Sequence, residues 1–150
     1  MINNAHPHKK DDITSNSIVE VLICDDETFI REALKSLLST YALLNSVAPI
    51  SKIMVVGEAT NGWEALQVIA KHQPDVVLMD AHMPVMDGFE ATRAIKASWP
   101  QVKVIMLTMY FAQQEAATEA GVDAFLLKGC PVEKLIDTIL TTCRPDNEHA

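Results

Sequence analysis

Five short apolar runs, each about the length of a β-strand, alternate along this chain with segments whose apolar residues recur at helical spacing. The predicted strands cover residues 19–24, 53–57, 76–79, 102–107 and 124–127. Strands that alternate with helices favour a parallel sheet with helices on both faces. The runs are nearly continuous in Val, Ile, Leu and Met, which is typical of strands buried on both faces. The sequence therefore predicts an α/β fold built on a five-stranded parallel sheet.

Two of the predicted helices carry a broad apolar stripe, in which apolar residues recur at i, i+3, i+4 and i+7. In the first helix the stripe consists of Ile30, Ala33, Leu34, Leu37, Leu38 and Tyr41, and in the last it consists of Val132, Leu135, Ile136, Ile139 and Leu140. The second helix is expected over residues 63–71, with Leu66, Ile69 and Ala70 turned inward. Such stripes favour helices that pack against the sheet.

The other two predicted helices differ in how firmly they should be held. The third covers residues 89–98, and Asp87 followed by Glu90 resembles a capping box at its start. The fourth, over residues 113–120, has only alanines as an apolar face and is expected to end at Gly121. Alanine buries little area, so we expect this helix to be either loosely docked or merely exposed.

A reactive side chain follows the apolar run in four of the five predicted strands. The carboxyl ends of parallel strands lie along one edge of a sheet, and ligands bind there. We therefore expect three carboxylates, one hydroxyl and one amine to converge, from Asp25, Asp26, Asp80, Thr108 and Lys128. Carboxylates are hard ligands that suit Mg²⁺ better than Zn²⁺, and a carboxylate can also attack a phosphoryl group. The pattern indicates a magnesium-dependent phosphoryl-transfer site.

Each of these residues also has an ordinary structural interpretation. Asp25 and Asp26 alone could be the N-cap of a helix that follows a strand. Thr108 alone could be a plain residue at a strand end, and Lys128 a solvated lysine. Asp80 is more specific, because the segment 83–88, Met-Pro-Val-Met-Asp-Gly, fixes a tight loop directly after it.

Taken together and in this order, these segments resemble the receiver domain of bacterial two-component response regulators, in the CheY-like superfamily, over about residues 19–142. Leu107-Thr108-Met109-Tyr110 and Leu127-Lys128-Gly129 make the chain most similar to receivers of NarL/LuxR-type regulators. The resemblance implies a doubly wound (βα)5 fold with strand order 2-1-3-4-5. Ala81 and the longer segment 43–51 depart from the family pattern. These departures affect the expected strand register and the surfaces near the site, and they leave the residues of the phosphorylation chemistry unchanged.

The resemblance also implies the roles of the acidic residues. Asp80 would accept a phosphoryl group from a sensor histidine kinase. Asp26, Asp80 and the backbone carbonyl of His82 would bind Mg²⁺ directly, while Asp25 would act on the ion through water.

Three further residues would bind the phosphoryl group and transmit its presence. Lys128 would pair with Asp80 and then with a phosphate oxygen, and Thr108 would donate a hydrogen bond to another phosphate oxygen. Movement of Thr108 would open space for Phe125, which would switch the surface formed by the fourth helix, the fifth strand and the fifth helix.

Charge and composition limit the classes of partner. The net charge of −8 argues against a domain that grips nucleic acid by itself. No apolar run approaches the roughly 20 residues that cross a bilayer, and residues 1–17 lack the apolar segment of a signal peptide. The three cysteines have no metal-binding spacing and suit a reducing cytoplasm. We expect a cytoplasmic receiver over residues 18–143, flanked by a flexible N-terminal tail, 1–17, and a C-terminal tail, 144–150.

Two interpretations of the output are open. Too few residues follow Thr142 to form a helix-turn-helix, so the chain is either a stand-alone receiver or a receiver whose DNA-binding output domain has been removed. The resemblance also allows a homodimer that forms on phosphorylation.

Two other classes of function fit the sequence less well. A pseudo-receiver that acts as an interaction module without phosphorylation would normally lack Asp80, Lys128 or the acid pair. An aspartyl-phosphate phosphatase would need an Asp-x-Asp arrangement after the first strand, which Asp25-Asp26-Glu27 does not provide. We therefore expect a protein that catalyses only its own phosphorylation and dephosphorylation.

Overall fold

The structure of this protein, a computed structural model, describes residues 17–44 and 52–143. Most of the predicted tails and of the segment 43–51 lies outside these ranges. Within them, the chain forms one sheet of parallel strands: β1 (Ile18–Cys24), β2 (Lys52–Ala59), β3 (Val76–Asp80), β4 (Lys103–Thr108) and β5 (Ala124–Leu127). Their order in the sheet is β2-β1-β3-β4-β5. This confirms the expected strand order, and every strand begins and ends within two residues of its prediction.

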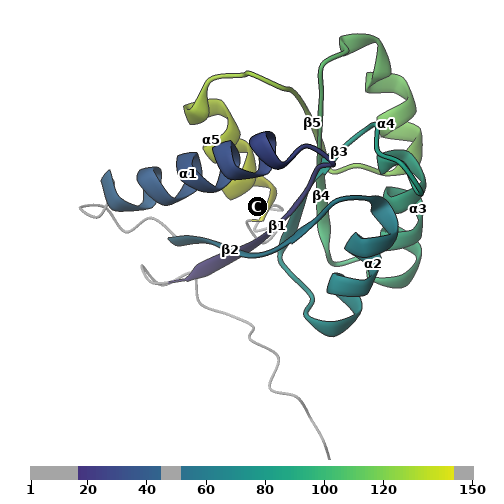
Figure 1. Cartoon of the computed structure of the whole chain (residues 1–150), viewed down its shortest axis with the longest axis horizontal. Coiled ribbons are helices and arrows are strands. Elements are labelled where there is room, and N and C mark those ends of the chain that lie inside the picture. Colours follow the sequence, from purple (N-terminus) through teal and green to yellow (C-terminus); the bar gives the residue numbers. More distant parts are fainter. Residues whose placement is uncertain (1–16, 45–51, 144–150) are drawn as a thin grey trace, which may run out of the picture.

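Helices cover both faces of the sheet. They are α1 (Thr28–Leu44), α2 (Gly62–Lys71), α3 (Gly88–Ser98), α4 (Gln114–Ala120) and α5 (Val132–Thr142), and a short 3-10 helix, η1 (Phe111–Gln113), precedes α4. Figure 1 shows α1 and α5 on one face of the sheet and α2, α3 and α4 on the other. The doubly wound (βα)5 architecture is therefore confirmed.

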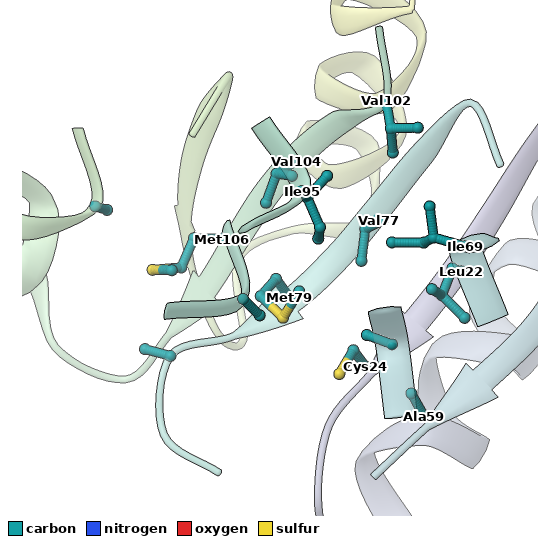
Figure 2. Close-up of a cluster of buried hydrophobic side chains, with 14 residues drawn as sticks. Leu22, Cys24, Ala59, Ile69, Val77, Met79, Ile95, Val102, Val104 and Met106 are labelled. Atoms are coloured by element: carbon teal, nitrogen blue, oxygen red, sulfur yellow. The ribbon is translucent and has the colours of Figure 1, made fainter. Parts of the chain in front are cut away.

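The core lies in two layers, one on each face of the sheet. Because successive side chains of a strand point to opposite faces, β3 sends Val77 and Met79 to one layer and Val76 and Leu78 to the other. Figure 2 shows the first layer, where side chains from the sheet pack against those of α2 and α3, such as Ile95. Burial on both faces is what the continuous apolar runs predicted.

Two positions of the predicted helix stripes are wrong. Leu37 is 44% exposed, although Leu38 beside it is buried. Ala70 is exposed, and the buried residues of α2 are Gly62, Ala65 and Ile69. Consecutive residues of an α-helix lie about 100° apart around its axis. If the buried face is centred one residue from the predicted position, a residue at the edge of the predicted stripe is turned toward solvent.

Helix α4 is docked through small side chains. Its buried residues are Ala117 and Ala120, and it ends at Gly121, whose φ of 101° is the left-handed conformation that glycine adopts readily. The predicted alanine-only face and the predicted helix end are both confirmed. Because two methyl groups bury little apolar area, α4 is weakly anchored compared with α5, which buries Leu135, Ile136 and Ile139.

The described residues contain neither a membrane span nor a disulfide. No helix within residues 17–44 and 52–143 is long and apolar enough to cross a membrane. All three cysteines are free thiols, and Cys24 is buried in the core as expected. Burial raises the pKa of the Cys24 thiol, so it remains protonated and behaves as a small core residue.

Candidate functional site

The predicted reactive side chains converge at the carboxyl edge of the sheet. Asp80 is the last residue of β3, and Asp25 and Asp26 directly follow β1. One carboxylate oxygen from each of these three residues lies within 4.8 Å of the others. Lys128 directly follows β5 and joins the same group through its ammonium. Parallel strands thus bring together four residues that are up to 103 positions apart, from 25 to 128.

Lys128 is paired with two buried carboxylates. Its Nζ lies 2.8 Å from Asp25 Oδ2 and 3.1 Å from Asp80 Oδ1. Asp25 is only 2% exposed and Asp80 only 7% exposed. Buried charges need partners, so this ammonium holds both carboxylates in place. The contact with Asp80 was expected, whereas the contact with Asp25 was missed because spacing along the sequence does not show which carboxylate a lysine meets first.

Burial and charge perturb the ionisation of this group. Burial, followed by the negative charge of Asp25, raises the pKa of Asp80, while Lys128 and the backbone N–H of His82 oppose that rise. Burial also disfavours the charge of Lys128, but its hydrogen bonds and attraction to the two carboxylates outweigh burial and raise the pKa of Lys128. Three carboxylates therefore face one ammonium, and the excess negative charge favours a bound cation.

Asp25 is fixed on every side. Its Oδ1 accepts a hydrogen bond from the backbone N–H of Glu27 at 2.9 Å, and its own N–H donates to the carbonyl of Ala59 at 3.1 Å. The guanidinium of Arg31 donates to the Asp25 carbonyl at 2.8 Å and pairs with Glu58 at 3.2 Å. The side chain of Asp25 therefore makes a local turn ahead of α1 and also pairs with Lys128.

The loop after Asp80 is as tight as the Pro-x-x-x-Gly pattern predicted. Met86 N–H donates to the carbonyl of Pro84 at 2.8 Å, which closes a γ-turn, and the central residue Val85 has a φ of 69°. Gly88 N–H donates to the carbonyl of Ala81 at 2.9 Å. A Cβ at Gly88 would lie 2.0 Å from the Asp80 carbonyl oxygen, so only glycine fits.

The expected N-cap of α3 is also present. The side chain of Asp87 accepts a hydrogen bond from the backbone N–H of Glu90 at 2.9 Å. Farther along, the Thr92 hydroxyl donates to the Gly88 carbonyl at 2.7 Å inside the buried first turn. These two bonds order the first turn of α3, and the bond from Gly88 N–H to the Ala81 carbonyl holds that turn against the end of β3.

Thr108 lies at the end of β4 with its hydroxyl already engaged. The residue is 1% exposed, and its hydroxyl accepts a hydrogen bond from the backbone N–H of Tyr110 at 3.2 Å. The hydroxyl donates to Oε1 of Gln113, whose Nε2 in turn contacts Nε2 of His82. The His82 ring also lies edge-on to the ring of Tyr110, with 6.4 Å between centroids.

Gln113 is the residue of this site that the sequence did not reveal. It ends η1, whereas the sequence pattern places Gln113 at the start of the fourth helix and predicts no turn before it. The only available signal was its position, five residues beyond a threonine at a strand end. That spacing does not predict a contact unless the chain turns back toward the strand, as η1 does.

Phe125 lies on β5, three residues before Lys128. It is opposite Met106 of β4, and its partly buried ring packs against the core layer on the α4 side of the sheet. The backbone N–H of Lys128 donates to the Thr108 carbonyl at 2.7 Å. Thr108 and Phe125 are therefore linked through two adjacent strands.

Comparison with known proteins gives a consistent match. The family model of the response regulator receiver domain matches residues 21–140. The response regulator protein VraR of Staphylococcus aureus strain Mu3 / ATCC 700698 is 38% identical over 131 residues, which cover 86% of this chain and 58% of VraR. The chain thus spans little more than half the length of the curated relatives that it matches.

Two solved structures are similar in fold. A LuxR-family DNA-binding response regulator from Staphylococcus aureus has a TM-score of 0.73 and 26% identity, with 84% of this chain and 99% of that chain covered. The signal receiver domain of a NarL response regulator from Mycobacterium tuberculosis has a TM-score of 0.73 and 30% identity, with 85% of this chain and 97% of that chain covered.

Proposed function

Because this chain belongs to the response regulator receiver domain family, we propose that Asp80 is the residue that accepts the phosphoryl group of its two-component system. The observation that carries this assignment is a buried carboxylate at the end of β3, 3.1 Å from Lys128 Nζ and within an oxygen cluster suited to a cation. A sensor histidine kinase is the phosphodonor. A carboxylate oxygen of Asp80 attacks phosphorus, the O–P bond forms, and the donor nitrogen leaves with the electron pair of the N–P bond.

Mg²⁺ fits the donor set of this cluster. Asp26, Asp80 and the backbone carbonyl of His82 would hold the ion, since hard oxygens in small number match magnesium. When bound, the ion offsets carboxylate repulsion and polarises the phosphoryl group. Asp25 acts through water, and its contacts support this role because one of its oxygens accepts from Glu27 N–H and the other pairs with Lys128.

Lys128 and Thr108 bind the phosphoryl group once it is on Asp80. The ammonium of Lys128 exchanges the Asp80 oxygen for a phosphate oxygen and keeps its contact with Asp25, so it stays charged throughout. The Thr108 hydroxyl donates to a second phosphate oxygen. Both groups are present before phosphorylation at the same sheet edge, which reduces the ordering required when the phosphoryl group arrives.

Movement of Thr108 toward the phosphate switches the surface formed by α4, β5 and α5. Phe125, linked to Thr108 through the β4–β5 pair, follows into the space that opens. Phenylalanine has no hydroxyl, so packing alone holds either position of the ring. The small buried area of α4 supports its role as the moving element, because few contacts have to be broken.

In the cell, this receiver works in the cytoplasm and catalyses only its own phosphorylation and dephosphorylation. Its phosphorylated form pairs with a second copy and controls a DNA-binding output domain of the NarL/LuxR type. The final effect is regulation of transcription. The names of the similar proteins, one of them a DNA-binding response regulator of the LuxR family, support this output. A pseudo-receiver is disfavoured, because the acid pair, Asp80 and Lys128 are all present, and Lys128 pairs with both Asp25 and Asp80.

The assignment of Asp80 is tested by labelling with acetyl phosphate in the presence of Mg²⁺. We expect wild type to gain one phosphoryl group by mass spectrometry and Asp80→Asn to gain none. Asp137→Asn is the matched control, because it removes an exposed carboxylate on α5 and should be labelled like wild type. Stoichiometric label on Asp80→Asn would refute the assignment.

A further inference from the structure

The side chain of Gln113 bridges two residues at the rim of the site. Its Oε1 accepts the hydrogen bond of the Thr108 hydroxyl, and its Nε2 contacts Nε2 of His82. Its backbone N–H donates to the Tyr110 carbonyl at 3.1 Å, which closes the turn of η1. Gln113 is partly buried, whereas the next residue, Gln114, is exposed. Of these adjacent glutamines, the first is therefore the one held in a defined position.

The contact with Gln113 uses the one proton that Thr108 can donate. A threonine hydroxyl has a single hydrogen and two acceptor lone pairs. In this structure the hydrogen points to Gln113, and the oxygen accepts the N–H of Tyr110. A phosphoryl oxygen on Asp80 needs the same hydrogen, because Tyr110 supplies a donor and cannot take its place. The two acceptors, the amide oxygen of Gln113 and the phosphoryl oxygen, exclude each other.

The orientation of the Gln113 amide is paired with one tautomer of His82. The amide oxygen faces Thr108 and the amide nitrogen faces His82; an amide nitrogen only donates, so His82 Nε2 acts as the acceptor in this arrangement. The opposite orientation would place the amide nitrogen against the hydroxyl and leave the threonine hydrogen available. The His82 tautomer with an unprotonated Nε2 therefore favours the orientation that occupies the hydroxyl.

We propose that Gln113 is a positioning residue that competes with the phosphoryl group for the Thr108 hydroxyl and thereby holds the receiver in its unphosphorylated arrangement. This inference rests on the phosphoacceptor function proposed above. Gln113 is the last residue of η1 and directly precedes α4. Loss of its bond to Thr108 on phosphorylation releases the start of the most weakly docked helix, so the competition for one proton is coupled to the α4 surface.

The probe for this proposal is beryllofluoride with Mg²⁺, an analogue of the phosphoryl group, titrated into the whole chain. Gln113→Leu removes the amide but keeps the size of the side chain, and it should bind beryllofluoride about two- to tenfold more tightly than wild type, the range set by the net value of one hydrogen bond. Gln114→Leu is the matched control and should bind like wild type. Gln113→Asn, whose shorter amide falls short of Thr108, should follow Gln113→Leu and serves if the leucine variant does not fold.

A double-mutant cycle separates this role from a purely structural one. In a Thr108→Val background, where no hydroxyl remains to be released, the Gln113→Leu change should have no effect on affinity. The amide NMR signals of Thr108 and Tyr110 should also shift in the Gln113→Leu variant, without beryllofluoride, toward their positions in the bound wild type. An unchanged or weaker affinity of Gln113→Leu, or an equal gain in the valine background, would overturn the proposal. Failure of wild type to bind beryllofluoride at all would instead refute the phosphoacceptor function.

Discussion

Replacement of Lys128 by methionine removes the only positive charge that meets both buried carboxylates in the described part of the chain, and it keeps the apolar stem. Asp25 and Asp80 would then face each other in a site that water barely reaches, with side chains 3% and 8% exposed. Removal of one partner of a buried ion pair typically destabilises a protein by 3–5 kcal/mol. The Lys128 side chain is itself 14% exposed, so we take the lower end and expect a loss of about 3 kcal/mol in the free energy of unfolding at neutral pH.

The loss should depend on pH in a defined direction. Lys128 is one of the two groups that lower the pKa of Asp80, so its removal raises that folded-state pKa further above the ordinary value of 3.8. When the folded-state pKa of a carboxyl group is raised, the protein is more stable while that group is protonated. The penalty is therefore absent below the unfolded-state pKa, grows as pH rises through the folded-state pKa, and is complete above it. On the alkaline side, the stabilisation by Lys128 in wild type persists until pH rises above its ordinary pKa of 10.5, because the ammonium stays charged up to that point.

Urea unfolding without divalent cations, at about pH 8 and about pH 4.5, measures both effects. With a slope near 2 kcal/mol per molar urea, a loss of about 3 kcal/mol lowers the midpoint by about 1.5 M at the higher pH. The difference between wild type and Lys128→Met should shrink at the lower pH. Lys134→Met, an exposed lysine on α5, is the control and should change little at either pH. An equal loss at both pH values would show that packing, rather than carboxylate repulsion, causes the destabilisation.

Two further predictions concern the metal and the switch. Asp26→Ala should weaken Mg²⁺ binding, measured by calorimetry, more than Asp25→Ala does, because both oxygens of Asp25 already have protein partners; equal losses would mean that the roles are misassigned. Beryllofluoride with Mg²⁺ should change amide hydrogen exchange most between residues 108 and 134, since Thr108 and Phe125 connect the site to that surface; a change confined to α2 would contradict the proposed switch.

The sheet and the converging residues could be predicted because each depends on a local pattern. An apolar run of strand length marks a buried strand, and the residue after it must lie at the sheet edge. The position of Asp80 follows from that rule alone. The N-cap of Asp87 and the end of α4 at Gly121 likewise depend on residues close together in sequence.

Features that depend on packing between distant segments could not be predicted. Leu37 belongs to a regular apolar stripe, and the stripe alone does not show that Leu38 rather than Leu37 turns toward the sheet. The pairing of Lys128 with Asp25 depends on the spacing between β1, β3 and β5 rather than on any motif. Gln113 meets Thr108 because η1 turns the chain back over the sheet edge, and no periodicity encodes a single 3-10 turn.

The contact between Gly88 and the backbone of Asp80 and Ala81 affects which parts of this protein can unfold locally. Since the first residue of α3 is hydrogen-bonded to Ala81, the residue after Asp80, α3 cannot fray from its start without disturbing the acidic cluster. Slow, cooperative exchange is therefore expected around Asp80 and the beginning of α3. In the part of the chain that the structure describes, no hydrogen bond or ion pair joins helix α4, on the same side of the sheet, to the acidic cluster, so α4 can detach alone. At this sheet edge, the acidic cluster is therefore expected to open only when the whole domain unfolds, whereas α4 opens by itself. The residues proposed for phosphoryl transfer thus lie in a stable part of the fold, and the surface proposed to switch lies in a more mobile part.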